Sequence, residues 1–238
     1  MNGRPGPTTR RNSHGTSTRS DRLRRQRDPL RHVPDGGGRF AEAGAPADLA
    51  RLWFATLLRD GFALAAAGDA APFGEIGAEV LTGLLDSSGV PDPEGTARRL
   101  ATSVAELPLH PDVTDGIRAL RAAGNRLVTL TNGSAQVAQK LFDAAGIRDE
   151  FEALLSVEDA PAWKPHPSSY RYAAQRCGTR EEDMLLVAVH PWDIHGAARA
   201  GLRTAWVNRI GGAYPSYLAR PELTVASLTH LATELAAG

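Results

Sequence analysis

The chain has 238 residues, 42% of them hydrophobic and 23% charged, which is enough to bury one sizeable core and a smaller second domain. Its formal net charge is zero, and its single cysteine, Cys177, excludes an internal disulfide framework and a zinc site built from several cysteines. No apolar run approaches the roughly 20 residues that span a bilayer and no signal-peptide core lies near the amino terminus, so we expect a cytoplasmic protein without a membrane partner.

The neutral total hides a basic amino-terminal segment. Residues 1–39 contain ten arginines and three aspartates, a net charge of +7, so residues 40–238 carry −7. Such a composition occurs in nucleic-acid-binding arms and in transit peptides, although nucleic acid is not the partner we favour. Apolar periodicity is nearly absent, and the Gly36–Gly38 run disfavours both helix and strand. The pattern therefore predicts that residues 1–39 are disordered.

A helical region follows. Apolar residues recur at spacings of three and four, which predicts helices over residues 50–67, 73–85 and 94–106. Glycine-containing breaks separate these segments. We therefore expect an all-helical domain over residues 40–108, with the Pro108–Pro111 segment marking its boundary.

Strand and helix patterns then alternate over residues 109–238. The first expected elements are a helix over 113–123, a strand over 127–130, a helix ending at Ala145, a strand over 154–157 and a helix over 168–175. Alternation of this kind predicts an α/β domain built on a doubly wound parallel sheet.

The clearest unit of this domain lies between Asp183 and Arg209. Residues 184–189 form a continuous apolar run of strand length, typical of a strand buried on both faces. A helix rich in small residues follows, and Gly201 stands where a left-handed helix cap is expected. A second strand is predicted over residues 204–207. Polar residues at the carboxyl end of the first strand make Asp193 a candidate functional residue, because open α/β sheets keep their sites at that edge.

Three polar clusters follow predicted strands and should meet at one edge of the sheet: Thr131 with Asn132, Lys164, and Asp193. A hydroxyl, an ammonium and a carboxylate together suit a small anionic substrate. Lys164 is one of two lysines beside 25 arginines, which favours a role for a compact cation. Each cluster also has a structural interpretation, since Thr131 and Asn132 could begin a helix, Lys164 could be a solvated surface residue and Asp193 could cap a helix.

In this order the motifs LTNGS, WKPHPSSY and WVNR resemble those of the haloacid dehalogenase-like (HAD) hydrolases, in the type II 2-haloacid dehalogenase branch. The resemblance covers roughly residues 40–225. It implies an α/β, Rossmann-type HAD-like core over residues 109–238, with residues 40–108 as the helical cap of that branch.

The resemblance also implies a covalent mechanism. An Asp at the end of the first core strand attacks the substrate carbon, and water hydrolyses the resulting ester. By matching position, Thr131 and Asn132 would bind the substrate carboxylate, and Lys164 would steady the nucleophile. Tyr170 would line the pocket, and Asp193 would orient Lys164 or the hydrolytic water. The branch implies a 2-haloacid-like substrate with no metal or cofactor, whereas the phosphatase members use Mg²⁺; a homodimer is an assembly that fits this reading.

The sequence departs from the branch at several positions. Where the branch has Ser-Ser-Asn-Ala-Trp-Asp, this chain has Ala188 and His190 in place of the water-handling Ser and Asn. Phe54 stands where a halide-binding Arg is expected, so Phe54 and His190 become candidate substrate-binding residues. The first motif, an apolar strand followed by Asp-x-x-x-Thr, is missing from residues 1–39.

A reading-frame error would explain the missing motif. The bases that encode residues 23–30, LRRQRDPL, can be chosen so that a frame shifted by one position reads Phe-Asp-Val-Asn-Glu-Thr-Leu. We call the chain with this segment restored the repaired chain. As written, the chain would lack the central strand and its Asp, and we predict that it folds poorly and has no hydrolase activity. The alternatives are a phosphatase of the same fold and a non-catalytic domain that binds a small anion or nucleic acid.

Overall fold

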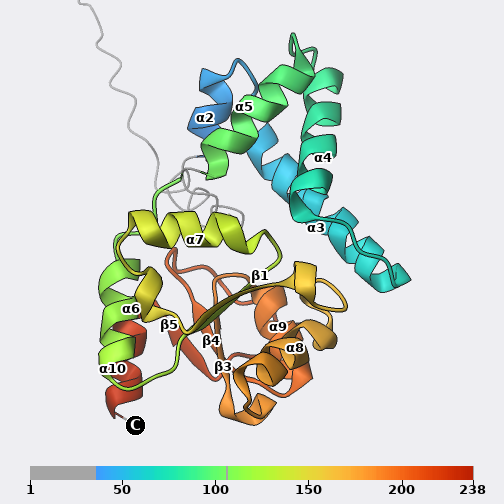
Figure 1. The fold of residues 1–238 in the computed structure, drawn as a ribbon. Helices are drawn as coiled ribbons and strands as arrows, with labels where there is room; N and C mark the ends of the chain where they lie inside the picture. The colour runs from blue at the N-terminus through green and yellow to red at the C-terminus, as the bar shows by residue number, and fades with distance from the viewer. Residues whose placement is uncertain (1–35, 106, 238) are drawn as a thin grey trace, which may run out of the picture.

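The computed structural model describes residues 36–105 and 107–237, so the predicted disorder and frame error of residues 1–35 lie outside the described residues. A group of helices sits beside an α/β unit that contains all the described strands (Figure 1). No helix in the described part combines the length and hydropathy needed to cross a membrane.

The first group has four helices, the three that the apolar periodicity predicts and one more, α2, before them. Their bounds are α2 Gly36–Glu42, α3 Leu49–Ala67, α4 Phe73–Ser87 and α5 Pro93–Ala105. Along α3, the buried residues Leu49, Trp53, Leu57 and Gly61 recur at every fourth position and form one face. The Trp53 indole donates a hydrogen bond to the Gly77 carbonyl at 2.8 Å, which joins α3 to α4.

The helix α2 corrects the expectation that Gly36–Gly38 excludes regular structure. Phe40 is 0% exposed, and its ring centroid lies 6.2 Å from that of Trp53. Burying a phenylalanine contributes about 2 kcal/mol, which offsets much of the cost of glycine in a helix, about 1 kcal/mol per residue. A Cβ on Gly37 would lie 3.2 Å from the Ala47 carbonyl oxygen, so the close approach of these segments also favours glycine.

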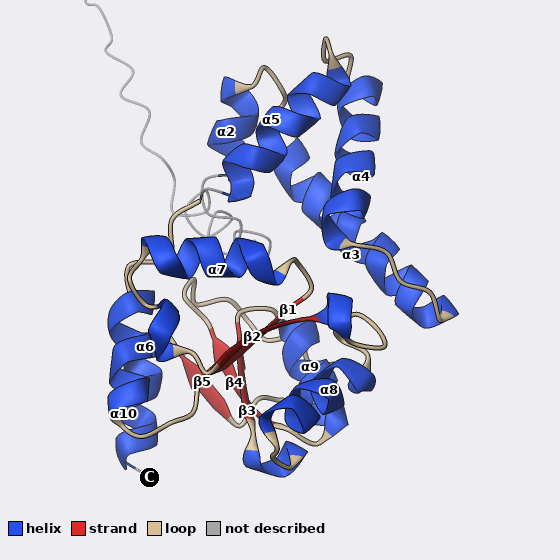
Figure 2. Cartoon of the chain, in the orientation of Figure 1, coloured by secondary structure: helices blue, strands red, loops and turns tan. Residues whose placement is uncertain are grey.

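The α/β unit contains α6 Val113–Ala122, β1 Val128–Thr131, α7 Ala135–Ala144, β2 Ala153–Ser156, α8 Pro167–Cys177, β3 Leu185–Ala188, α9 Pro191–Ala200, β4 Arg203–Val207, β5 Leu223–Val225 and α10 Leu228–Ala237, with short 3-10 helices at Arg148–Glu150, Val157–Asp159 and Glu181–Asp183. Where an element was expected, its bounds agree with the sequence pattern to within two residues. The elements β5 and α10 were not expected. All strand pairs are parallel, and Figure 2 shows α6 with α10 on one side of the strands and α8 with α9 on the other.

The described strands form two separate sheets, β1-β2 and β3-β4-β5. Strands β1 and β3 are half-buried along their whole length, whereas β4 is buried at four of its five residues. Leu130 of β1 and Leu186 of β3 pack against the same buried cluster around Tyr170, so the two strands adjoin one core. Within the described residues, one edge of β1 and one edge of β3 have no ladder partner.

Trp163 connects the α/β unit to the helical group. Its buried ring belongs to the apolar cluster of the helices, stacks on Phe73 with centroids 5.6 Å apart, and donates a hydrogen bond to the Ala71 carbonyl at 3.1 Å. A Cβ on Gly61 would overlap this ring, at 2.2 Å from its nearest atom. The residue before Lys164 is thus fixed by contacts with both α3 and α4.

Asp112 joins three segments of the α/β unit. Its carboxylate accepts hydrogen bonds from Arg209 at 2.9 and 3.0 Å and from the Leu228 N–H at 2.8 Å. These contacts connect the start of α6 to the loop after β4 and to the start of α10. Burial alone favours the neutral acid, but the hydrogen bonds and the charge of Arg209 outweigh it and hold the pKa of Asp112 below its usual range.

We predict that Asp112→Asn lowers the free energy of unfolding by about 2 kcal/mol at neutral pH, since hydrogen bonds between charged groups are lost. A carboxyl whose folded-state pKa is depressed stabilises the fold above its unfolded-state pKa, and that contribution disappears as the pH falls through the folded-state value. The difference between parent and variant should therefore shrink below about pH 4.

Urea unfolding of the repaired chain, followed by circular dichroism, measures this difference. The control is Asp115→Asn, because Asp115 is exposed on the same helix. A difference for Asp112→Asn that is constant from pH 7 to pH 3.5 would contradict the assigned role of its charge.

Candidate functional site

The polar residues predicted to converge come from three segments at the carboxyl edge of the strands. Thr131 ends β1 and Asn132 follows it, Lys164 lies in the loop before α8, and Asp193 lies in the first turn of α9. The structure brings Asn132, Lys164 and Asp193 into one hydrogen-bonded network with Tyr170.

Lys164 and Asp193 form a buried ion pair. The Lys164 Nζ lies 2.7 Å from Asp193 Oδ2, and the two residues are 7% and 4% exposed. Burying two charges is unfavourable unless their remaining hydrogen-bonding groups find partners. Asp193 meets this condition at its second oxygen, Oδ1, which accepts from the Tyr170 hydroxyl at 2.7 Å. Its place in the first turn of α9 adds the favourable field of a helix amino terminus.

Tyr170 is fully buried, and its hydroxyl contacts Asp193. The residue is 0% exposed, and burial together with the charge of Asp193 raises the pKa of its phenol well above the usual range. The phenol therefore stays protonated and donates to Asp193. This packing depends on Gly196, because a Cβ there would lie 2.7 Å from the Tyr170 hydroxyl and 2.6 Å from Pro165 Cβ. Tyr170, which the resemblance implies lines the pocket, is thus buried here with its hydroxyl on Asp193.

Asn132 and Thr131 make different contacts. The Asn132 side chain is 7% exposed, accepts a hydrogen bond from the Lys164 N–H and donates one to the Lys164 carbonyl, both at 3.0 Å. The Thr131 hydroxyl is half-buried and accepts from the Gly133 N–H at 3.0 Å, which leaves its proton available to a further acceptor. Thr131 does not cap the next helix; Ser134 caps α7 by accepting a hydrogen bond from the Gln136 N–H.

Phe54 and His190 belong to a row of rings between α3 and α9. The centroid of Phe54 lies 5.7 Å from that of His190, and His190 stacks on Trp192 at 5.4 Å with an interplanar angle of 14°. Trp192 meets Phe62 edge to face at 5.0 Å. Phe62 was not predicted as a site residue, although it lies eight positions after Phe54 and hence on a neighbouring face of α3. The positions where the branch has a halide-binding Arg and an Asn are here in ring contact with each other.

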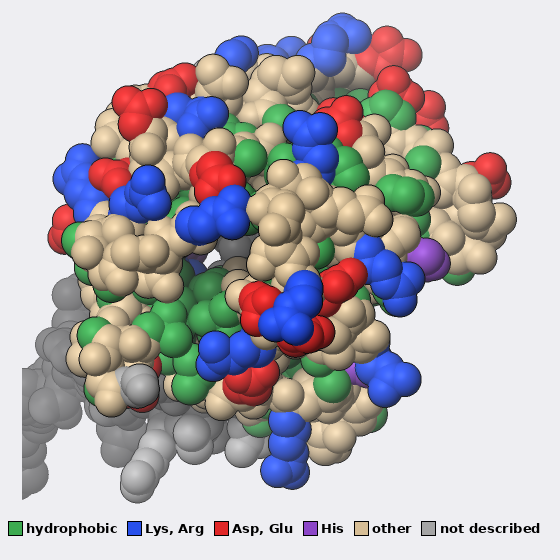
Figure 3. All heavy atoms as spheres, turned by 60° about the horizontal axis from the view of Figure 1, so that its bottom comes forward, with side chains coloured by type: hydrophobic (Ala, Val, Ile, Leu, Met, Phe, Trp, Pro, Cys, Tyr) green, Lys and Arg blue, Asp and Glu red, His purple; other side chains and the backbone are tan. Residues whose placement is uncertain are grey.

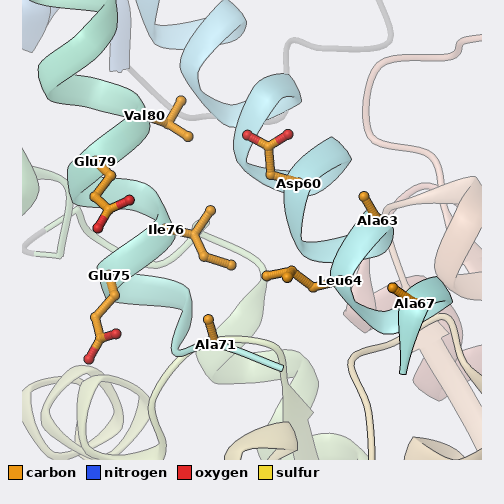
Figure 4. Close-up of a pocket in the computed structure, with 9 residues that line it drawn as sticks. All are labelled: Asp60, Ala63, Leu64, Ala67, Ala71, Glu75, Ile76, Glu79 and Val80. Carbon is orange, nitrogen blue, oxygen red and sulfur yellow. The ribbon is translucent and has the colours of Figure 1, made fainter. Parts of the chain in front are cut away.

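A cavity of about 490 Å³ lies between α3 and α4, lined by none of the residues of the Lys164–Asp193 network (Figure 4). Its walls combine apolar side chains with three carboxylates and are formed by Asp60, Ala63, Leu64, Ala67, Ala71, Glu75, Ile76, Glu79 and Val80. None of the predicted site residues lines it. Within residues 36–105 and 107–237, no group of three or more His, Cys, Asp and Glu side chains is arranged to hold a metal ion.

Comparison with known proteins places this geometry in a family. The family model described as haloacid dehalogenase-like hydrolase matches residues 42–201. Haloacetate dehalogenase H-2 of Moraxella sp. (strain B) is 34% identical over 182 residues, which cover 76% of this chain and 81% of that protein. The (S)-2-haloacid dehalogenase 4A of Burkholderia cepacia is 29% identical over 82% of this chain and 81% of its own length.

A solved structure agrees with these matches. A dehalogenase crystallised with an intermediate superposes with a TM-score of 0.78 at 29% identity, over 84% of this chain and 89% of that one. The α/β fold with parallel sheets, predicted from the alternating pattern, is confirmed. By its sequence match and by its fold, the chain belongs to the haloacid dehalogenase-like hydrolases.

Proposed function

We propose that this site is built to hydrolyse a small 2-substituted carboxylic acid of the 2-haloacid kind, and that the chain as written lacks the carboxylate that starts the reaction. The proposal rests chiefly on one observation, the buried Lys164–Asp193 pair at the carboxyl edge of the strands. The printed functions of the relatives, haloacetate and (S)-2-haloacid dehalogenases, give the substrate class.

The proposed chemistry needs a carboxylate beside Lys164. That carboxylate attacks the carbon bearing the halogen, the halide leaves with its bonding electrons, and an ester forms. Water then cleaves the ester, releasing the hydroxy acid and a proton and restoring the carboxylate. The Lys164 ammonium has three N–H donors, and Asp193 takes one of them, so two can hold the nucleophile ionised and positioned.

The remaining residues bind the substrate and support Lys164. Thr131 can donate its proton to the substrate carboxylate, since its oxygen already accepts from the Gly133 N–H. Asp193 balances the charge of Lys164 in a buried setting, and Tyr170 keeps Asp193 in place. Phe54 and His190 form the side of the site toward α3, where their rings favour an apolar substituent on the substrate over a strongly hydrated one.

The missing nucleophile is proposed to lie in the segment that the shifted frame would restore. Among the described residues, Asp193 is the carboxylate that pairs with Lys164, and it already bonds to Tyr170. The restored segment would supply a strand between β1 and β3, whose facing edges have no partner within the described part. A carboxylate at the end of that strand would lie at the same edge as Thr131 and Lys164.

The two alternatives receive less support. A phosphatase would need ligands for Mg²⁺, and Asp193 is committed to Lys164 and Tyr170. A nucleic-acid-binding domain would need a basic field, but acidic and basic side chains are interspersed on the face in Figure 3. The basic residues 1–35 lie outside the described residues. Their contribution to nucleic-acid binding can be tested by comparing the salt dependence of binding in the full chain and in a variant that lacks residues 1–39.

We predict that the written chain does not release chloride from racemic 2-chloropropionate, whereas the repaired chain releases chloride and lactate in equal amounts. Lys164 and Thr131 position the reacting groups but cannot attack the substrate carbon themselves, so no reaction starts without the nucleophilic carboxylate. Ion chromatography measures the chloride. Parallel reactions contain p-nitrophenyl phosphate, each with and without Mg²⁺.

Two results would count against this proposal. Turnover by the written chain would show that no nucleophile is missing, and Mg²⁺-dependent release of phosphate alone by the repaired chain would favour the phosphatase. Sequencing the gene over codons 20 to 39 tests the frame hypothesis separately, which fails if no other frame can encode Asp-x-x-x-Thr.

We also predict that Lys164→Met in the repaired chain lowers kcat by at least about 100-fold, because a preorganised positive charge at the reacting group is lost. Lys140→Met is the matched control, since Lys140 is the other lysine of the chain and is exposed on α7. Steady-state kinetics on 2-chloropropionate give kcat for each variant. An equal fall in kcat in both variants would contradict a specific catalytic role for Lys164.

A further inference from the structure

Asn132 makes an unusual pair of contacts with the main chain of Lys164. Its amide oxygen accepts from the Lys164 N–H and its amide nitrogen donates to the Lys164 carbonyl, both at 3.0 Å. The two residues are 32 positions apart, so the contact joins the loop after β1 to the loop before α8. Asn132 is buried, which removes competition from water.

This arrangement fixes both the position and the rotation of the Lys164 backbone. Two bonds in opposite directions act like one rung of a β-ladder, whereas a single bond would leave the peptide free to pivot. Aspartate could accept from the N–H but could not donate to the carbonyl, and an apolar residue could do neither. Among side chains of this length, asparagine alone satisfies both groups.

We call these two hydrogen bonds between Asn132 and the main chain of Lys164 the clamp. Neighbouring contacts support the segment on each side of it. The Ser156 hydroxyl donates to the Gly133 carbonyl at 2.8 Å and so supports the loop that carries Asn132. The Ser169 hydroxyl donates to the Ala162 carbonyl at 2.8 Å and supports the loop that carries Lys164. In the described part of the chain, however, the N–H and the carbonyl of Lys164 itself have Asn132 as their hydrogen-bond partner.

We infer that Asn132 is a positioning residue that sets the Lys164 ammonium against Asp193, and that its contribution to the reaction comes through Lys164 rather than through contact with the substrate. The inference replaces the substrate-binding role that the resemblance implies for Asn132. It rests on the proposed function only insofar as Lys164 acts in catalysis; the clamp itself can be tested in a chain with no activity.

The lysine content of the chain provides the test. Lys140 and Lys164 are the only lysines, one exposed and one buried, so acetylation by limiting acetic anhydride gives two peptides whose modification is compared by mass spectrometry. In the repaired chain, whose restored segment contains no lysine, Lys164 should react at least about tenfold more slowly than Lys140. Asn132→Ala should raise the ratio of Lys164 to Lys140 modification about tenfold, because two hydrogen bonds that hold the buried segment are lost.

Two controls separate a local from a global effect. Thr96→Val changes a buried residue of α5 and should leave the ratio unchanged. Cys177, the single thiol, ends α8 and is partly buried, so its rate of alkylation reports opening of the unit that follows Lys164. The clamp predicts that Asn132→Ala changes Lys164 labelling while Cys177 alkylation stays at the parent rate.

A near-isosteric variant decides the case in which Asn132→Ala opens the whole unit. Asn132→Asp keeps the acceptor for the Lys164 N–H and loses the donor to the carbonyl, so it should give an intermediate ratio with parent-like Cys177 alkylation. The inference is overturned if Asn132→Asp leaves the ratio of Lys164 to Lys140 modification at the parent value and Asn132→Ala does the same while its Cys177 is alkylated at the parent rate.

Kinetics of the repaired chain provide the second readout. If Asn132 acts through Lys164, Asn132→Ala lowers kcat about as Lys164→Met does, with little change in KM; a raised KM with kcat preserved would overturn the inference in favour of a substrate contact. If the repaired chain is inactive, the proposed function fails, and the labelling ratio still decides whether the clamp exists.

Discussion

The arrangement of this site depends on keeping an ammonium and a carboxylate together out of water. A buried ion pair contributes little on balance unless every remaining donor and acceptor is satisfied, so Lys164 and Asp193 require partners around them. Tyr170 supplies one for Asp193, and Gly196 allows α9 to approach closely enough for that bond. Asn132 holds the backbone from which Lys164 extends. Four segments of the chain thus meet at this edge, and together they give the pair its partners.

The same pair explains why a second carboxylate fits beside it. Lys164 and Asp193 together carry no net charge, so an added carboxylate would leave one negative charge near the amino terminus of α9, where the helix dipole favours it. The ammonium has donors to spare. The proposed nucleophile would therefore find a favourable electrostatic setting here, and β1 and β3 each have an edge without a ladder partner among the described residues.

Much of this could be read from the sequence because it depends on local patterns. Apolar runs predicted β1, β2 and β3, and polar residues in the loops after these strands identified Asn132, Lys164 and Asp193 as neighbours. Other features depend on contacts between distant residues. Phe40 overrides the low helix propensity of three glycines by packing on Trp53, and no local signal predicts that. The strand β5 is three residues long and is defined by its pairing with β4.

The roles within the site follow the same division. A motif gives the type of residue and its place at a strand end, so Lys164 and Asp193 were predicted by chemistry and position. Whether a polar side chain faces the substrate or its neighbours depends on the packing around it. Tyr170 and Asn132 are both buried, and each satisfies a polar group of the ion pair's surroundings.

The contacts of Trp163 extend this dependence to the helical group. Its ring lies against Gly61 and Phe73, and the next residue in the chain is Lys164. A displacement of α3 relative to α4 would therefore move the backbone that Asn132 holds. Because α3 also carries Phe54 and Phe62, the same helix contacts both the ring row beside His190 and the residue before Lys164. Substitutions on the buried face of α3 should consequently alter substrate preference and the placement of Lys164 together, rather than one at a time.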